Sequence, residues 1–161
     1  MNDSTPTTNI VIAGLGGQGI ITASDIIADV AFRAGHDVKK AEVHGMSQRG
    51  GSVNTDIRYG AEVLSPMVPD GEAHLMLLVD TTQATVNQHR LAPDGQVISV
   101  ETLEGVKLPN PKTANVALLG MLSAKLDLPL DAWHAAIREA LPPNTHDMNL
   151  AAFRLGRELA A

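Results

Sequence analysis

The chain of 161 residues contains no cysteine, one tryptophan, one tyrosine and two phenylalanines. Without cysteine it can form no disulfide, thiolate nucleophile or cysteine-ligated iron–sulfur cluster, so any electron transfer must take place on another chain. So few aromatic side chains do not favour a pocket in which this chain stacks against a large planar ring.

Long apolar runs and an excess of basic charge are also missing. No run of eighteen apolar residues occurs, and the polar start has no basic and apolar leader pattern, so we expect a cytoplasmic, soluble protein that does not bind a membrane. The formal net charge of -6 argues against a nucleic-acid partner. The six histidines are scattered without metal-ligand spacing, so no metal site is expected on this chain.

Short apolar runs alternate with helical patterns over the first hundred residues. The length and 44% hydrophobic content suit one domain over residues 1–161, with residues 1–8 expected to be flexible. We predict an α/β, Rossmann-like fold: a mainly parallel sheet with helices on both faces and a helical C-terminal part. The expected strands are 9–13, 37–42, 52–59, 73–79 and 96–100, and the expected helices are 20–34, 82–90, 114–126, 129–141 and 150–159. In the 82–90 helix Val86 should face inward, and Pro93-Asp94-Gly95 should form a turn.

The first candidate site is Gly14-Leu15-Gly16-Gly17-Gln18-Gly19, which lies between the first expected strand and the first expected helix. Glycines let several backbone N–H groups approach another molecule, and the helix dipole adds partial positive charge at the same place. The segment is therefore a candidate phosphate site, in which Gly14, Gly16, Gly17, Gln18 and Gly19 present the backbone.

The spacing of these glycines also fits the G-x-G-x-x-G pattern of a dinucleotide site. That pattern requires an acidic residue about 20 positions further on to bind a ribose hydroxyl. Here Lys39 and Lys40 precede the carboxylate of Glu42, and a lysine such as Lys39 suits a phosphate better. An NAD(P)-binding module remains an alternative, as does a turn that only allows a strand and a helix to pack closely.

The second candidate site is the segment from His44 to Ser52, which should lie at the same sheet edge as the first. Ser47, Gln48 and Arg49 place a hydroxyl, an amide and a guanidinium just before Gly50. Arg49 could hold a phosphate or carboxylate in a bidentate fork, or it could pair with a nearby acidic side chain. His44 could donate or accept a proton, or it could be a hydrogen-bonded structural histidine.

Several segments together resemble the gamma-type subunits of 2-oxoacid:ferredoxin oxidoreductases, and most closely the small beta subunits of indolepyruvate:ferredoxin oxidoreductases. The resemblance covers nearly the whole chain. It rests on Ile10–Gly19, on Glu42–Val53 with its Met-Ser-Gln-Arg-Gly-Gly run, on Arg58-Tyr59-Gly60 with Ser65-Pro66, on Asn115–Gly120 and on Asn149–Gly156.

The resemblance implies an enzyme complex of aromatic amino acid catabolism. Such a complex oxidatively decarboxylates a 2-oxoacid with coenzyme A to an acyl-CoA and carbon dioxide, and passes electrons to ferredoxin or another acceptor. Thiamine diphosphate with magnesium and 4Fe-4S clusters would belong to a large alpha subunit, because this chain has no cysteine and no Gly-Asp-Gly run followed by paired asparagines. The complex is expected to be a hetero-oligomer, a dimer of heterodimers.

For this chain the resemblance implies a role in binding CoA and in closing the thiamine site. The glycine turn with Lys39 or Arg49 would hold the CoA phosphates, while Ser47, Gln48, Arg49 and Gly50 would face the partner or the CoA tail. His44 and Arg49 are the candidate catalytic residues. A third possibility is a purely structural subunit that does not touch CoA.

Overall fold

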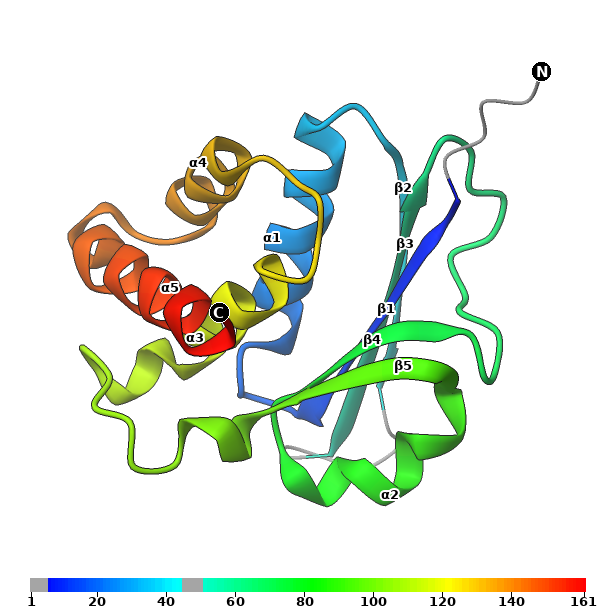
Figure 1. Ribbon diagram of the computed structural model, residues 1–161, viewed down its shortest axis with the longest axis horizontal. Coiled ribbons are helices and arrows are strands. Elements are labelled where there is room, and N and C mark those ends of the chain that lie inside the picture. Colours follow the sequence, from blue (N-terminus) through cyan, green and yellow to red (C-terminus); the bar gives the residue numbers. More distant parts are fainter. Residues whose placement is uncertain (1–5, 45–50) are drawn as a thin grey trace.

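A computed structural model describes residues 6–44 and 51–161 of the chain. It contains one five-stranded sheet and five helices, arranged as a sheet with a thick helical layer on one side (Figure 1). The strands are β1 (Thr8–Leu15), β2 (Asp37–His44), β3 (Ser52–Gly60), β4 (Ala73–Leu78) and β5 (Leu91–Ser99). The helices are α1 (Ile20–Arg33), α2 (Ala84–Asn87), α3 (Ala114–Ser123), α4 (Leu130–Ala140) and α5 (His146–Ala160).

The sheet is mixed, with the strand order β2-β3-β1-β4-β5. β1 pairs in parallel with β4, and β4 in parallel with β5, whereas β3 is antiparallel to both β1 and β2. Four strands therefore run in one direction, and β3 alone runs against them. The predicted α/β class with a mainly parallel sheet is confirmed, with β3 as the exception, since it inserts antiparallel between β1 and β2.

The first strand and helix form for the reasons that their sequence suggests. β1 is buried on both faces from Asn9 to Gly14, and Thr8, expected in a flexible start, is already paired with Tyr59. The apolar residues of α1 face the sheet, and the helix ends at Gly35, whose φ of 92° lies in the left-handed region. The N–H of Gly35 donates to the carbonyl of Phe32 at 3.0 Å, which closes the last turn.

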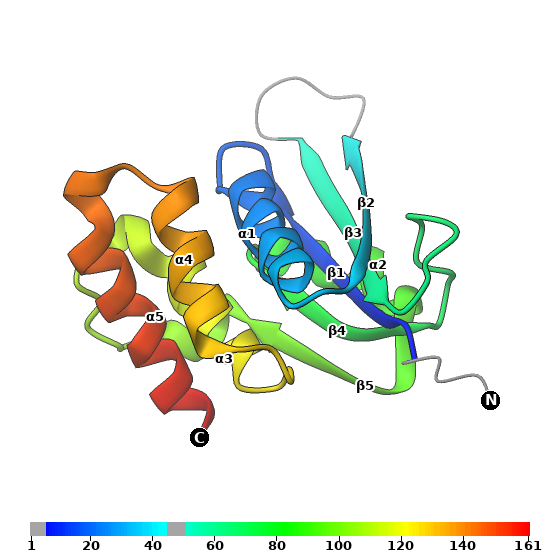
Figure 2. The same ribbon diagram turned by 90° about the horizontal axis from the view of Figure 1, so that it is seen from above.

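The two faces of the sheet are covered differently (Figure 2). The four longer helices all lie on one face, where Trp133 and Phe153 are fully buried. Among the described residues, the other face is covered by the segment 61–72 and by the short segment around α2. Val68 of the first of these segments packs on Val11 and Met76. The prediction of helices on both faces is therefore corrected to one helical face and one face covered mainly by a loop.

Two local predictions also needed correction. The expected helix 82–90 is broken into the four-residue α2 with a 3-10 turn on each side, and Val86 is 60% exposed instead of facing inward. Its buried side chains are polar: Asn87 Nδ2 donates to the carbonyl of Gln83 at 2.9 Å, and Asn87 Oδ1 accepts from Asn54 at 3.0 Å. Pro93–Gly95 lies inside β5, where the register with β4 shifts, and does not precede the strand.

Among the residues that the structure describes, no helix is long and apolar enough to cross a membrane.

Candidate functional site

The glycine turn between β1 and α1 contains two residues whose backbone conformation is rare for any residue with a Cβ atom. Gly17 has a φ of 88° and Gly19 a φ of 79°, both in the left-handed region. A Cβ on Gly19 would also come within 2.5 Å of the Asn115 side chain on α3. The turn therefore requires glycine at 17 and 19, and Gly19 brings the start of α1 against α3.

Gln18 holds this turn in place. Its Oε1 accepts the N–H of Leu15 at 2.8 Å, and its Nε2 donates to Asp80 Oδ2 at 2.8 Å, just beyond the end of β4. Both ends of the amide are thus engaged within the chain. The side chain joins the ends of two neighbouring parallel strands, so its observed role is to shape the turn.

Asp80 supports the same edge from the β4 side. Its Oδ1 accepts from the hydroxyl of Thr82 at 2.5 Å and from the Thr82 N–H at 3.0 Å, which caps the following 3-10 turn. The Thr82 hydroxyl, then Gln18 and the Thr82 N–H, lower the pKa of Asp80 below its usual value. The carboxylate is therefore ionised at neutral pH and fixed in position. A Val-Asp-Thr-Thr sequence after an apolar strand is the capping signal that could have revealed Asp80.

The second glycine-rich segment begins and ends beside this turn. β2 ends at His44, paired with Val53, and the N–H of Gly16 donates to the carbonyl of Gly51 at 2.9 Å. The ends of the two segments therefore lie at one sheet edge. Residues 45–50, which include the candidates Ser47, Gln48, Arg49 and Gly50, lie outside the described residues, and for His44 the structure gives only the backbone.

Two hollows flank the turn. The smaller one, about 230 Å³, is lined by the turn, the first residues of α1 and Val53. The larger one, about 520 Å³, lies between the turn and the start of α3 and includes Val79, Lys112 and Asn115. Gly19, the N-cap of α1, gives no side-chain hydrogen bond to the first turn, whose N–H groups have no partner within the helix. An anion in either hollow would face partial positive charge.

Lys112 is a residue that the sequence analysis missed. It lines the larger hollow in an exposed 3-10 turn that the Asn110 side chain caps, where Asn110 Oδ1 accepts the N–H of Lys112 at 2.9 Å. Among the described residues no ion pair of its amino group occurs. The Asn-Pro pair at 110–111 predicts such a turn, but the sequence could not show that it folds back to the glycines.

Lys39 is not brought to the turn. It lies in register with Arg58 and Asn9, five residues before Gly14 along β1, or about 17 Å away. Its amino group contacts Asp37 at 3.1 Å. The candidate set is therefore divided, with the glycines and Gln18 at one sheet edge and Lys39 near the other.

The described residues hold no group of three or more histidine, aspartate or glutamate side chains that could bind a metal ion.

Fold and site together define a Rossmann-like α/β protein with a glycine turn between its first strand and its first helix. The sequence model of the pyruvate ferredoxin/flavodoxin oxidoreductase family matches residues 9–109 and 98–159. The chain therefore belongs to this family, as the sequence resemblance predicted.

Relatives with full-length matches include indolepyruvate oxidoreductase subunits IorB. The protein of Thermococcus kodakarensis is 34% identical over 94% of this chain and 95% of its own length, and that of Archaeoglobus fulgidus is 33% identical over 92% of each. A 2-oxoglutarate synthase subunit KorC from Methanothermobacter marburgensis is 27% identical over 93% of this chain and 95% of its own.

Solved structures share the fold. The gamma subunit of a keto/oxoacid ferredoxin oxidoreductase from Geobacter sulfurreducens superposes with a TM-score of 0.77 at 19% identity, covering 96% of this chain and 97% of that one. The 2-oxoglutarate:ferredoxin oxidoreductase of Magnetococcus marinus, solved with 2-oxoglutarate, coenzyme A and succinyl-CoA bound, gives 0.79 at 20% identity. The match covers 96% of this chain and only 31% of that longer chain.

Proposed function

We propose that this chain is the small subunit of an indolepyruvate-type 2-oxoacid:acceptor oxidoreductase, and that its glycine-turn edge binds the phosphates of coenzyme A beside the active site of a larger subunit. The complex would convert a 2-oxoacid and CoA into an acyl-CoA and carbon dioxide, and two electrons would pass to ferredoxin or a similar acceptor. Identity of 34% to an IorB subunit over almost the full length supports the assignment to this type.

The observation that carries the proposal is the turn itself. The start of α1 is uncapped, the glycines of the turn are left-handed, and a hollow of about 520 Å³ lies beside Lys112. An anion in this hollow would meet backbone N–H groups, the positive end of a helix dipole and a lysine. A CoA diphosphate carries charge of the matching sign. Arg49, seven residues beyond Glu42 in the neighbouring segment, is proposed as a second cation for the same ligand.

The redox and carbanion chemistry would belong to the partner. Thiamine diphosphate supplies the carbanion chemistry in such enzymes and iron–sulfur clusters carry the electrons. This chain has no cysteine to ligate a cluster. Its own residues would bind and orient CoA and exclude water from the active site. His44, Ser47, Gln48 and Gly50 are proposed to face the partner's active site from the same edge.

Substrate selection is also proposed to lie on the partner. Trp133 and Phe153 are fully buried within the helical layer, and Tyr59 is 5% exposed. Phe32, the one remaining aromatic side chain apart from histidine, lies at the end of α1 that is remote from the glycine turn. The aromatic residues of this chain therefore do not line the candidate site.

The sheet topology favours this proposal over an NAD(P)-binding module. In a dinucleotide fold the carboxylate for the ribose stands at the end of the strand next to β1. Here antiparallel β3 occupies that position, and β2 with Glu42 lies one strand further away, roughly 10 Å from β1.

The test uses the assembled complex with the large subunit. Lys112→Gln and Arg49→Gln should each raise the KM for CoA about tenfold, which corresponds to the loss of one charge-assisted contact of about 1.4 kcal/mol. The KM for the 2-oxoacid should stay the same. Lys125→Gln, an exposed lysine near the opposite sheet edge, is the matched control.

An unchanged KM for CoA in both variants would refute the CoA site. A chain that stays alone in solution and binds a pyridine nucleotide tightly would favour the alternative module. Native mass spectrometry of the complex would also test the proposed dimer of heterodimers.

A further inference from the structure

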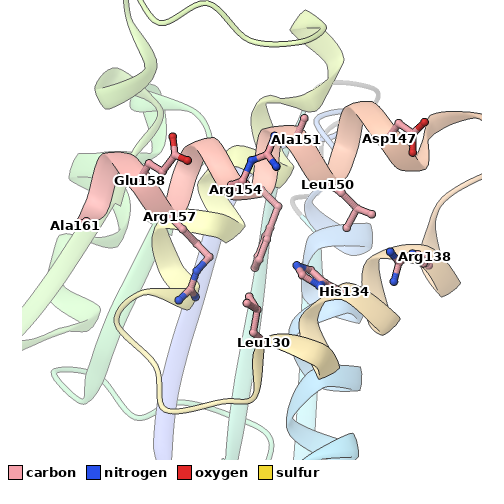
Figure 3. A pocket seen from close by; sticks show the side chains of 11 residues that line it. Leu130, His134, Arg138, Asp147, Leu150, Ala151, Arg154, Arg157, Glu158 and Ala161 are labelled. Atoms are coloured by element: carbon pink, nitrogen blue, oxygen red, sulfur yellow. The ribbon is translucent and has the colours of Figure 1, made fainter.

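A second feature lies on the outer side of the helical layer, away from the glycine turn. α4 and α5 enclose a groove of about 500 Å³ (Figure 3). Its walls are single faces of the two helices, because the lining residues recur at helical spacing. From α4 they include Leu130, His134 and Arg138, and from α5 they include Leu150, Arg154 and Arg157.

The floor of this α4–α5 groove is apolar. Phe153 is fully buried there, and the ring of His134 meets it edge-on with centroids 5.9 Å apart. Leu130 lies at the rim and is 43% exposed. The exposed part of Leu130 and the half-buried Leu150 stay in contact with water unless another molecule covers them.

The rim carries three arginines against two carboxylates, Asp147 and Glu158, in a chain whose net charge is -6. The Arg157 guanidinium is fixed, since it donates to Ser123 Oγ of α3 at 2.9 Å. Arg138 and Arg154 are exposed, and neither guanidinium forms an ion pair or hydrogen bond with another described residue. Asp147 and Glu158 lie near the two ends of α5. Arg138 lies at the same end of the groove as Asp147, Arg157 is next to Glu158 in the sequence, and Arg154 lies between the two ends.

The shape of the groove indicates a helix as its occupant. The lining residues of α5, with Ala161 directly after the helix, extend from Asp147 over about 21 Å along the helix axis, and those of α4 cover about 12 Å. A compact small molecule would use only part of this length. A third helix of three to four turns, laid between α4 and α5 with an apolar stripe inward, would fill it.

We propose that the α4–α5 groove receives an acidic amphipathic helix of the large subunit, with carboxylates placed opposite Arg138 and Arg154. This inference rests on the proposed function, which supplies the large subunit. Charge complementarity selects an acidic segment. Apolar burial against Leu130 and Leu150 supplies the affinity, and the arginines set orientation and association rate.

The α1 helix of a second copy of this chain fits the groove less well. Asp25 on this helix is exposed and Asp29 is half-buried, but Asp25 is hydrogen-bonded to Lys40 and Asp29 pairs with Arg33 at 3.0 Å. These acidic groups of the helix are therefore already neutralised.

The experiment measures association of the full chain with the large subunit at about 0.15 M salt. Arg138→Glu/Arg154→Glu should weaken the complex at least tenfold, and the wild-type affinity should fall as salt rises. Arg33→Glu/Lys125→Glu makes the same charge change at exposed positions outside the groove and should have little effect. Thermal melts of each isolated variant check that it folds.

A direct contact can be mapped because the chain has no cysteine of its own. Ala151→Cys, labelled with a photo-crosslinker, should react with one helical, acid-rich segment of the large subunit. A wild-type complex that ignores the Arg138/Arg154 reversal, or that weakens equally with the control, would overturn the groove proposal and leave the proposed function standing. Failure of the wild-type chain to bind the large subunit at all would instead refute the proposed function.

Equilibrium sedimentation of this chain alone gives the remaining outcome. If the chain forms a dimer that the Arg138/Arg154 reversal abolishes, the occupant of the groove is a second copy of this chain and not the large subunit.

Discussion

Two glycines set the distance between the helices of the C-terminal part. At Gly156 of α5 an added Cβ would lie 1.9 Å from the carbonyl oxygen of Ala117, and at Gly120 of α3 it would lie 2.1 Å from that of Phe153. In each case the obstacle is backbone of the facing helix, which cannot rotate away. α3 and α5 therefore pack with their backbones in close contact, and Phe153 of α5 is fully buried in the core.

Gly156→Ala should destabilise the chain. Helix propensity alone would make this change favourable by about 1 kcal/mol. The collision with Ala117 forces α5 away from α3, and overpacking of this kind costs about 1–3 kcal/mol or more, so the net sign is reversed. Urea denaturation measures the free energy of unfolding. A variant as stable as the wild type, or more stable, would mean that the helices separate at little cost.

The Asp80 carboxylate gives a second prediction at the residue scale. Its pKa in the folded state is lowered, so its contribution to stability is complete above the unfolded value of 3.8 and disappears as the pH falls below it. Thr82→Val removes the hydroxyl that contributes most and should raise this pKa. Carbon-13 NMR of the carboxyl group measures it. Gln18→Ala should raise it less, and the reverse order of the two variants would contradict the assignment.

At the scale of elements, a buried ion pair attaches the loop-covered face to the sheet. Arg90 donates to both carboxylate oxygens of Asp56, at 2.8 and 2.6 Å, and to the carbonyl of Val68 at 3.0 Å. Asp56 is fully buried in β3 and also accepts the N–H of Val68 at 2.9 Å. One pair therefore joins β3, the 61–72 loop and the segment that contains α2.

Arg90→Met should cost about 3–5 kcal/mol, because it leaves the Asp56 carboxylate buried without its charged partner. The loop should also open, so the Val68 N–H should exchange faster with solvent in hydrogen-exchange measurements. Arg33→Met breaks an exposed pair with Asp29 and should cost less than about 1 kcal/mol. Equal losses from the two substitutions would show that the buried pair contributes no more than an exposed one.

Elements with a strong local pattern were predictable from the sequence. β1, the glycine turn and α1 follow from an apolar run, glycines and apolar residues at helical spacing, all within 26 residues. The segment around α2 was misread because its buried contacts are the amides of Gln83 and Asn87, which no hydrophobic pattern marks, while Val86 faces solvent. The insertion of β3 beside β1 depends on pairing between distant residues, which local periodicity does not encode.

At the scale of the whole molecule the candidate site was predictable only in part. The glycines predicted the turn, but Lys112, which lines the hollow beside it, comes almost a hundred residues later in the sequence. Lys39 lies far from the turn despite its position in a dinucleotide-type pattern. Residues distant in sequence meet there because α3 packs against the turn through Asn115 and Gly19. The family assignment came from several segments together, because no single motif would support it.

If the chain completes a site on a larger subunit, activity should depend on the ratio of the two chains. Titrated into a purified large subunit with CoA, a 2-oxoacid and an electron acceptor, the chain should raise activity in proportion until one small subunit is present per large one. The reason is that CoA phosphates would lack their glycine turn and Lys112 in the large subunit alone. The Lys112→Gln chain should saturate at the same ratio but require more CoA. Full activity of the large subunit by itself would show that this chain completes nothing in the active site.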